Sequence, residues 1–137
     1  MRILSLPALA LAVAACTPTA AEQARIDDRA AVAQTNLGTA LAGLVPGKPT
    51  TCLPLTRTTQ YQTESFGPTI LYRYSRGLVY RSDTSGGCEG IARGDILVTR
   101  QPTGRLCSGD IATTIDRVSR FQTGSCSFGT FTPYRKR

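Results

Sequence analysis

Four widely spaced cysteines constrain the fold of this 137-residue chain more than any other feature. They follow one another at intervals of 36, 19 and 19 residues and are Cys52, Cys88, Cys107 and Cys126. Structural zinc sites use paired C-x-x-C ligands or histidines, and the chain contains neither. The spacing therefore argues against such a metal site and predicts two disulfides, on condition that the protein reaches a compartment that oxidises thiols.

The pairing of these cysteines is open, because four cysteines allow three connectivities and their order in the sequence does not choose among them. We favour Cys88 with Cys107 and Cys52 with Cys126, since the second pair would join the two ends of one domain. In the chain-entropy model the two loops would contribute about 3 and 4 kcal/mol to the free energy of unfolding. Such contributions are a large share of the stability of a domain this small.

The compartment depends on the N-terminal segment. Met1 and Arg2 give a minimal positive region, residues 3–12 are almost all apolar, and the run Val-Ala-Ala-Cys closes the segment at Cys16. A stable membrane-spanning helix needs about 20 apolar residues, so this stretch is too short to be one. Residues 1–15 therefore predict a removable export signal.

The closing tetrapeptide, from Val13 to Cys16, resembles the bacterial lipoprotein signal, in which a branched apolar residue and two small residues precede the cysteine at the cleavage site. The resemblance implies that Cys16 begins the mature protein and carries a diacylglyceryl thioether and an acylated amine. The alternative is an ordinary secretory signal cut near Ala14 or Ala15, which also exports the protein. Thr17 stands where an Asp would mark inner-membrane retention in enteric bacteria. We therefore expect an anchor in the outer membrane, facing the periplasm.

Residues 19–44 carry a helical pattern. Their apolar positions recur every three or four residues, at Ile26, Ala30, Ala33, Leu37, Leu41 and Leu44. Thr19 and Glu22 fit a capping box at the start, and Pro46 follows the end. Because the polar face mixes both signs of charge, we expect a helix that spaces the domain from the lipid or packs against it. A helix that binds a partner or lies on the membrane is the alternative.

After Pro49 the sequence changes to short β-rich runs separated by Gly, Pro, Asp and Ser. Residues 70–74 and 78–81 alternate and flank a Ser-Arg-Gly turn that suits a hairpin. Further runs cover residues 96–100, 111–118 and 126–131. We predict a mainly β fold, in which one N-terminal helix precedes a small disulfide-bonded antiparallel barrel or bent sheet of five to seven strands.

The same patterns divide the chain into four regions. A signal peptide covers residues 1–15, and a lipid-anchored tether with the amphipathic helix covers residues 16–49. The β-rich four-cysteine domain covers residues 50–134, and a basic tail follows at residues 135–137.

Two segments near the C-terminus, residues 104–111 and 124–134, resemble a family of small exported proteobacterial proteins of unknown function that are common in sphingomonad-like bacteria. The resemblance extends over roughly residues 52–134. It implies a single four-cysteine domain and supplies no activity.

The chain contains no histidine, which excludes Ser-His and Cys-His nucleophile pairs and removes the commonest general base near neutral pH. Asp95 and Asp110 each follow a glycine and are expected to cap turns. The carboxylates in the β-rich region fit no catalytic motif; those we considered are Asp83, Glu89, Asp95, Asp110 and Asp116. We therefore predict a protein without cofactor or metal that is not an enzyme, but a binding or structural module of the envelope. An inhibitor of an exported or host enzyme and a carboxylate-based hydrolase are the alternatives.

The net charge of +7 comes mainly from arginine. Nucleic acid is not an expected partner, because an exported protein rarely meets it. Three cations end the chain after Tyr134: Arg135, Lys136 and Arg137. We expect them to form a projecting tail, most simply a solvated end of the chain. The alternative is a contact with an anionic envelope surface or an envelope protein, since a basic side chain near an anionic membrane contributes about 1 kcal/mol to binding.

Overall fold

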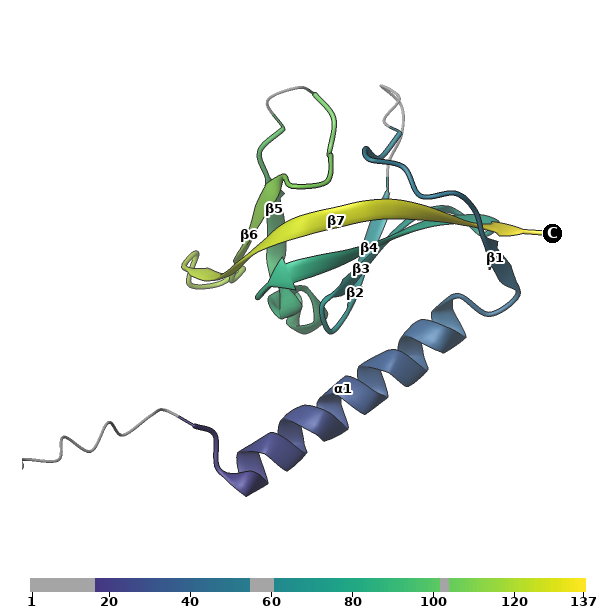
Figure 1. Ribbon diagram of the computed structural model, residues 1–137. Coiled ribbons are helices and arrows are strands. Elements are labelled where there is room, and N and C mark those ends of the chain that lie inside the picture. The colour runs from purple at the N-terminus through teal and green to yellow at the C-terminus, as the bar shows by residue number, and fades with distance from the viewer. Residues whose placement is uncertain (1–16, 55–60, 102–103) are drawn as a thin grey trace, which may run out of the picture.

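The computed structural model describes residues 17–54, 61–101 and 104–137 (Figure 1). Within these ranges the chain forms one α-helix, one short 3-10 helix and seven strands. In chain order they are α1 (Ala20–Ala40), β1 (Leu44–Pro46), β2 (Gln62–Phe66), β3 (Thr69–Ser75), β4 (Leu78–Gly86), η1 (Glu89–Arg93), β5 (Ile96–Thr99), β6 (Ile111–Ile115) and β7 (Gln122–Lys136). The predicted mainly β class with one preceding helix is confirmed.

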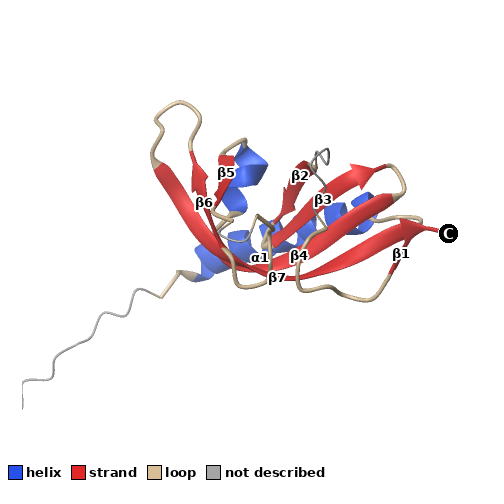
Figure 2. Cartoon of the chain, turned by 90° about the horizontal axis from the view of Figure 1, so that it is seen from above, coloured by secondary structure: helices blue, strands red, loops and turns tan. Residues whose placement is uncertain are grey.

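The strands form one antiparallel sheet in the order β2-β3-β4-β7-β6-β5. β7 has 15 residues and pairs with β4 along one side; along its other side it pairs first with β6 and, near its end, with β1. The register shifts where β7 pairs with β4 and where it pairs with β6, and in both places the extra residue lies on β7 and adds local bending. The sheet curls into a half-barrel, and its edge strands β2 and β5 do not pair with each other within the described residues (Figure 2). The predicted bent antiparallel sheet is thus confirmed.

The inner face of the half-barrel holds the main core. Because side chains alternate between the two faces along a strand, Ile70 and Tyr72 of β3 share this face and join Tyr80 of β4 in one buried cluster. Phe128 and Phe131 of β7 belong to the same cluster, and their rings lie within 6.2 Å of the Tyr72 ring, centroid to centroid. Each large apolar side chain that is fully buried contributes about 1.5–3 kcal/mol to stability.

The outer face is covered over β3 and β4 by the C-terminal half of α1. Leu37 is the buried residue of this helix, and it packs on Leu71 and Val79, which are fully buried. Residues 20–32 of the helix are exposed, and Ile26 retains 51% of its accessible surface. Figure 1 shows the helix running below the sheet and diverging from it toward the N-terminus. One half of the predicted apolar stripe therefore packs on the domain, while the other half extends beyond it.

The predicted capping box is present at the start of α1. Glu22 N donates a hydrogen bond to Thr19 Oγ1 at 3.3 Å, and Thr19 N donates to Glu22 Oε2 at 2.8 Å. The helix ends at Ala40 instead of residue 44, because Gly43 turns the chain with a φ of 74° and Leu44 enters β1. Since β1 pairs with β7, the predicted domain boundary after residue 49 is wrong, and the sheet begins before it.

Two disulfides join Cys52 to Cys107 and Cys88 to Cys126. The prediction of two disulfides is confirmed, and the favoured pairing is wrong. The sheet register explains the observed pairing: Gly86 at the end of β4 pairs with Cys126 on β7, which brings Cys88 beside Cys126. An isolated antiparallel bridge aligns Cys52 with Cys107 in the same way. The order of cysteines along the chain contains no information on either alignment.

Candidate functional site

The predicted signal at residues 1–15 and the predicted lipid attachment site at Cys16 lie outside the described residues. The described chain begins with three residues, 17–19, that lead directly into α1. No helix in the described ranges is both long and apolar enough to cross a membrane. Lipid attachment at Cys16 therefore stays a prediction.

The predicted basic tail is built into the sheet. Arg135 belongs to β7, where it pairs with Leu78 of β4 and with Val45 of β1. Lys136 also belongs to β7, and its backbone N donates a hydrogen bond to Gly77 O at 3.0 Å. The prediction of a projecting tail is therefore wrong for these two residues, because strands on both sides hold their backbone.

The side chains of these cations nevertheless remain exposed. The same contact between Lys136 and Gly77 places the β3–β4 turn, with exposed Arg76, beside the end of β7. We call this cluster the basic end; it consists of Arg76, Arg135, Lys136 and Arg137. Arg76 was not predicted as part of this cluster, because it lies about 60 residues away in the chain and joins the cluster only through strand pairing.

Four of the five acidic residues considered as catalytic candidates accept hydrogen bonds within the described residues, and Asp83 accepts one from the Thr69 hydroxyl at 2.6 Å. Asp110 accepts a hydrogen bond from Cys107 N at 2.7 Å, which confirms its predicted role as a turn cap. Asp95 is buried and accepts instead from the Thr123 hydroxyl, so its predicted contact with a backbone N–H is replaced by a contact with a side chain. Within the described residues no group of three His, Cys, Asp or Glu side chains could hold a metal ion.

A turn between β6 and β7 presents apolar side chains to solvent. Val118 is 92% exposed and Phe121 is 76% exposed. Hydrogen bonds define the backbone of this turn: the Asp116 carboxylate accepts from Val118 N at 2.9 Å and from Ser119 N at 2.7 Å, and Asp116 N donates to Phe121 O at 3.0 Å. The backbone hydrogen bond from Ser119 lowers the pKa of the Asp116 carboxyl, so the anion that caps the turn is favoured.

An exposed arginine directly precedes each of these apolar side chains, Arg117 before Val118 and Arg120 before Phe121. Arg120 has a φ of 62°, a left-handed conformation that side chains other than glycine rarely adopt, and its N donates to Asp116 O at 3.1 Å. Arg117 Nε donates to Gly94 O, just before β5. A strained residue persists only where its surroundings define the conformation. We call residues 116–121 the apolar turn.

The outer face of β5 and β6 leads into the apolar turn. Leu97 of β5 packs on the inner core and Ala112 of β6 belongs to it, so their neighbours along each strand point outward. The apolar residues among them are Ile96, Val98, Ile111 and Ile115. Val98 is 39% exposed and Ile111 is 60% exposed. This half of the outer face therefore leaves apolar side chains in contact with solvent.

The apolar turn was not predicted from the sequence, because Val118 extended the β-rich run of residues 111–118. The signal that could have found it is Phe121, an isolated aromatic among polar neighbours, two of which are arginines. Such a residue in a surface turn has no partner along its own strand and is expected to meet solvent or another molecule.

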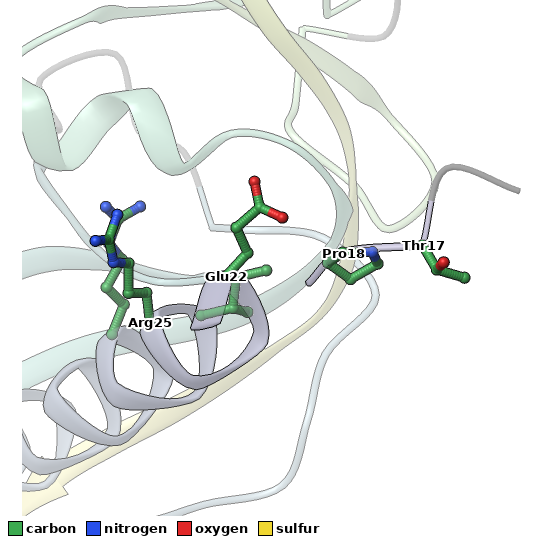
Figure 3. A pocket seen from close by; sticks show the side chains of 6 residues that line it. Thr17, Pro18, Glu22 and Arg25 are labelled. Carbon is green, nitrogen blue, oxygen red and sulfur yellow. The ribbon is translucent and has the colours of Figure 1, made fainter. Parts of the chain in front are cut away.

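A shallow hollow lies beside the start of α1. Figure 3 shows the Glu22 and Arg25 side chains rising from the same side of this helix. The residues that line the hollow are Thr17, Pro18, Glu22, Arg25, Ile26 and Arg29. The Glu22 carboxylate already accepts hydrogen bonds from Thr19, whose backbone N–H lowers the pKa of this carboxyl. Because every lining residue is exposed and belongs to the helix or the segment before it, we assign no ligand to this hollow.

The described part of the chain thus defines a class of structure: a mainly β half-barrel with one preceding helix and two disulfides. Comparison with known proteins gives no match to a family model, to a curated protein or to a solved structure. The resemblances found in the sequence therefore stay predictions.

Proposed function

We propose that the protein is an exported binding module without enzymatic activity, anchored to the outer membrane through lipid on Cys16 and facing the periplasm. In this proposal the apolar turn rests on the surface of the bilayer. The observation that carries it is the turn itself, which presents Val118 and Phe121, each directly after an arginine, on a backbone defined by hydrogen bonds.

The chemistry of the apolar turn suits the boundary between headgroups and acyl chains. Removing apolar surface from water contributes about 25 cal/mol per Å², and each arginine near anionic lipid contributes about 1 kcal/mol. A single lipid chain binds a membrane only marginally, so a second contact strengthens the attachment. Residues 1–15 carry one charged side chain, Arg2, so the net charge falls from +7 to +6 without them and still adds long-range attraction to an anionic surface.

The place of the apolar turn in the molecule supports the same proposal. In Figures 1 and 2 the β6–β7 turn and the start of α1 lie at the same end of the molecule, and the C-terminus lies at the other end. Residues 17–19 separate the helix from Cys16. A lipid on Cys16 and the apolar turn can therefore reach one bilayer. The basic end then faces away from it, toward anionic groups of an envelope polymer or protein.

The absence of enzymatic activity in this proposal is supported by the acidic residues. Asp110 and Asp116 accept hydrogen bonds from backbone N–H groups, and Asp95 accepts one from a hydroxyl. These carboxylates already stabilise local structure, and the chain has no histidine to act as a general base.

The test uses a soluble form that begins at Thr17, sedimented with anionic and with neutral vesicles at low and at moderate salt. We expect binding to anionic vesicles that weakens as salt rises. Replacing Val118 and Phe121 together by Ser should remove most of this binding. Arg120→Asn should reduce its salt-dependent part, because Asn tolerates the left-handed conformation at this position while lacking the charge.

The matched control is Tyr74→Ser, which removes an exposed aromatic outside the apolar turn; Tyr74 is 53% exposed. This variant should bind vesicles like the unchanged protein. Acyl mass on Cys16 in protein isolated from the envelope would support the anchor independently of the turn. Equal sedimentation of the Val118→Ser, Phe121→Ser protein and the control would refute the role of the apolar turn.

A further inference from the structure

The basic end carries positive charge, and the segments that form it contain no acidic side chain. Residues 44–48, 74–79 and 132–137 meet at this end and include no Asp or Glu. All nine acidic residues of the chain lie in the described ranges, so the other residues add none. The ion pairs within the described ranges involve other arginines, which are Arg73, Arg81 and Arg93. The exposed cations of the basic end are therefore available to an anion from another molecule.

Strand pairing places these cations on both faces of the sheet. Arg135 lies opposite Leu78 of β4, and opposite residues of an antiparallel pair point to the same face. Leu78 packs on the inner core, so the Arg135 side chain starts from the inner face. Lys136 lies opposite Leu44 of β1, which packs on the cluster beneath α1, so the Lys136 side chain starts from the outer face. Two consecutive cations of β7 thus stand on opposite sides of the same sheet.

The β3–β4 turn adds a third cation where the two faces meet. A Cβ at Gly77 would lie 3.6 Å from the Cβ of Lys136, so this turn lies against the end of β7. Arg76 directly precedes Gly77 and is exposed. Adjacent strands are about 4.8 Å apart, which is less than the Debye length of about 10 Å at 0.1 M salt. Charges on these neighbouring segments therefore act on the same part of an approaching anion.

We propose that the basic end binds a flexible linear polymer with repeated carboxylate or phosphate groups, and that this polymer crosses the end of the sheet from the inner to the outer face. A flat bilayer or the rigid surface of a folded protein would meet the cations of one face, whereas a flexible chain bends around the end and meets both. Guanidinium groups match carboxylate and phosphate with two parallel hydrogen bonds, and three of the four cations are arginines.

This inference rests on the proposed function, because it names the partner that the basic end meets on the side away from the bilayer. The basic end and the apolar turn lie at opposite ends of the molecule (Figures 1 and 2). A polymer bound at one end therefore leaves the other end free to contact the membrane.

The test titrates the soluble form that begins at Thr17 with polygalacturonate, which carries carboxylates, with inorganic polyphosphate, and with uncharged dextran. Backbone amides are followed by NMR at low and at moderate salt. We expect saturable shifts at Arg76, Gly77 and Arg135 with at least one anionic polymer, an affinity that falls as salt rises, and no shifts with dextran. The polymer that binds more tightly identifies the anion. No bilayer is present, so this result does not depend on the apolar turn or on lipid attachment.

Variants test each face of the sheet separately. Arg135→Gln removes the cation of the inner face and Lys136→Gln that of the outer face, and each should weaken the affinity about fivefold. The matched control is Arg25→Gln with Arg29→Gln, which removes two exposed cations at the start of α1. This control should change the affinity less than about twofold, although it loses as much charge as the two variants combined. Because all these side chains are exposed, the variants should melt at the temperature of the unchanged protein.

The proposal is overturned if neither anionic polymer shifts the amides of the basic end at low salt. Equal affinities of the control and of the protein with Arg135→Gln and Lys136→Gln together would also overturn it, because the binding would then follow net charge alone. A loss of affinity in one of the two single variants but not in the other would show that the polymer stays on one face, which contradicts the proposed path around the end of the sheet.

Discussion

The two halves of the sheet share one inner core but differ in their outer layer. Over β3 and β4 the helix α1 covers the outer face, and Leu71 and Val79 beneath it are fully buried. Over β5 and β6 the outer face keeps Val98 and Ile111 exposed at 39% and 60%. The same alternation of apolar residues therefore leads to burial in one half and to an open apolar surface in the other.

Two disulfides stabilise the half of the sheet whose outer face has no covering helix. Cys88–Cys126 joins the segment after β4 to the part of β7 that pairs with β6, and Cys52–Cys107 attaches the segment after β1 to the β5–β6 connection. Both bonds therefore fasten the uncovered half to the rest of the molecule. Small domains commonly need disulfides where their apolar core is limited. A face held in this way can present apolar side chains to a partner without depending on a covering helix.

Reduction of both disulfides is expected to produce the largest difference in stability between the two halves of the sheet. The bonds close loops with sequence separations of 38 and 55 residues, and the chain-entropy model assigns about 4 kcal/mol to each. Amides of β5 and β6 should therefore lose protection from hydrogen exchange at lower reductant concentrations than amides of β3 and β4. Hydrogen exchange followed by mass spectrometry measures this difference. Simultaneous loss of protection in both halves would show that the disulfides do not stabilise them differently.

Truncating an outward-facing side chain to Ala should produce the next largest difference between the two halves, measured as the free energy of unfolding. Leu71→Ala removes a fully buried side chain and leaves a cavity, so we expect the free energy of unfolding to fall by about 2–5 kcal/mol. Ile111→Ala removes a side chain that is 60% exposed and should change it by about 0.5 kcal/mol or less. Denaturant unfolding at one pH measures both values. Similar losses for the two variants would mean that the uncovered face is buried in solution.

Acidification should have a smaller and more local effect, confined to the apolar turn. Hydrogen bonds from Ser119 and Val118 hold the pKa of Asp116 below its ordinary value of 3.8. A group whose pKa is lowered by folding stabilises the native state above the unfolded pKa and loses that contribution as pH falls through the folded pKa. The turn should therefore loosen as the pH falls below 3.8 and through the lowered pKa of the carboxyl, where the carboxylate becomes protonated.

The amide shifts of Val118 and Ser119, followed by NMR between pH 6 and pH 2, measure this loosening. Asp116→Asn is the matched control, because it keeps an acceptor oxygen but cannot ionise in this range. Its turn amides should show little pH dependence. Identical titration curves in the two proteins would assign the transition to another group.

Local features of this molecule could be predicted from sequence because they depend on neighbouring residues. The capping box needs only Thr19 and Glu22 three positions apart, and it forms as expected. The hairpin of β3 and β4 needs only two alternating runs and a short turn, and it too is present. The apolar turn was missed because one valine fits a strand and a turn equally well, and the hydrogen bonds of Asp116 decide between them.

The amino-acid sequence alone was sufficient for the mainly β class, the helix that precedes it and the existence of two disulfides. The pairing of the cysteines, the inclusion of Arg135 and Lys136 in β7, and the uncovered outer face of β5 and β6 emerged from long-range alignment. The physical reason is that local patterns specify backbone periodicity and turn chemistry, whereas the register between distant strands depends on how the whole sheet buries its inner face. A cysteine or an arginine far along the chain has no local preference for a partner. Its neighbours depend on the strand register, which is set as the sheet curls around Phe131 and the rest of the core.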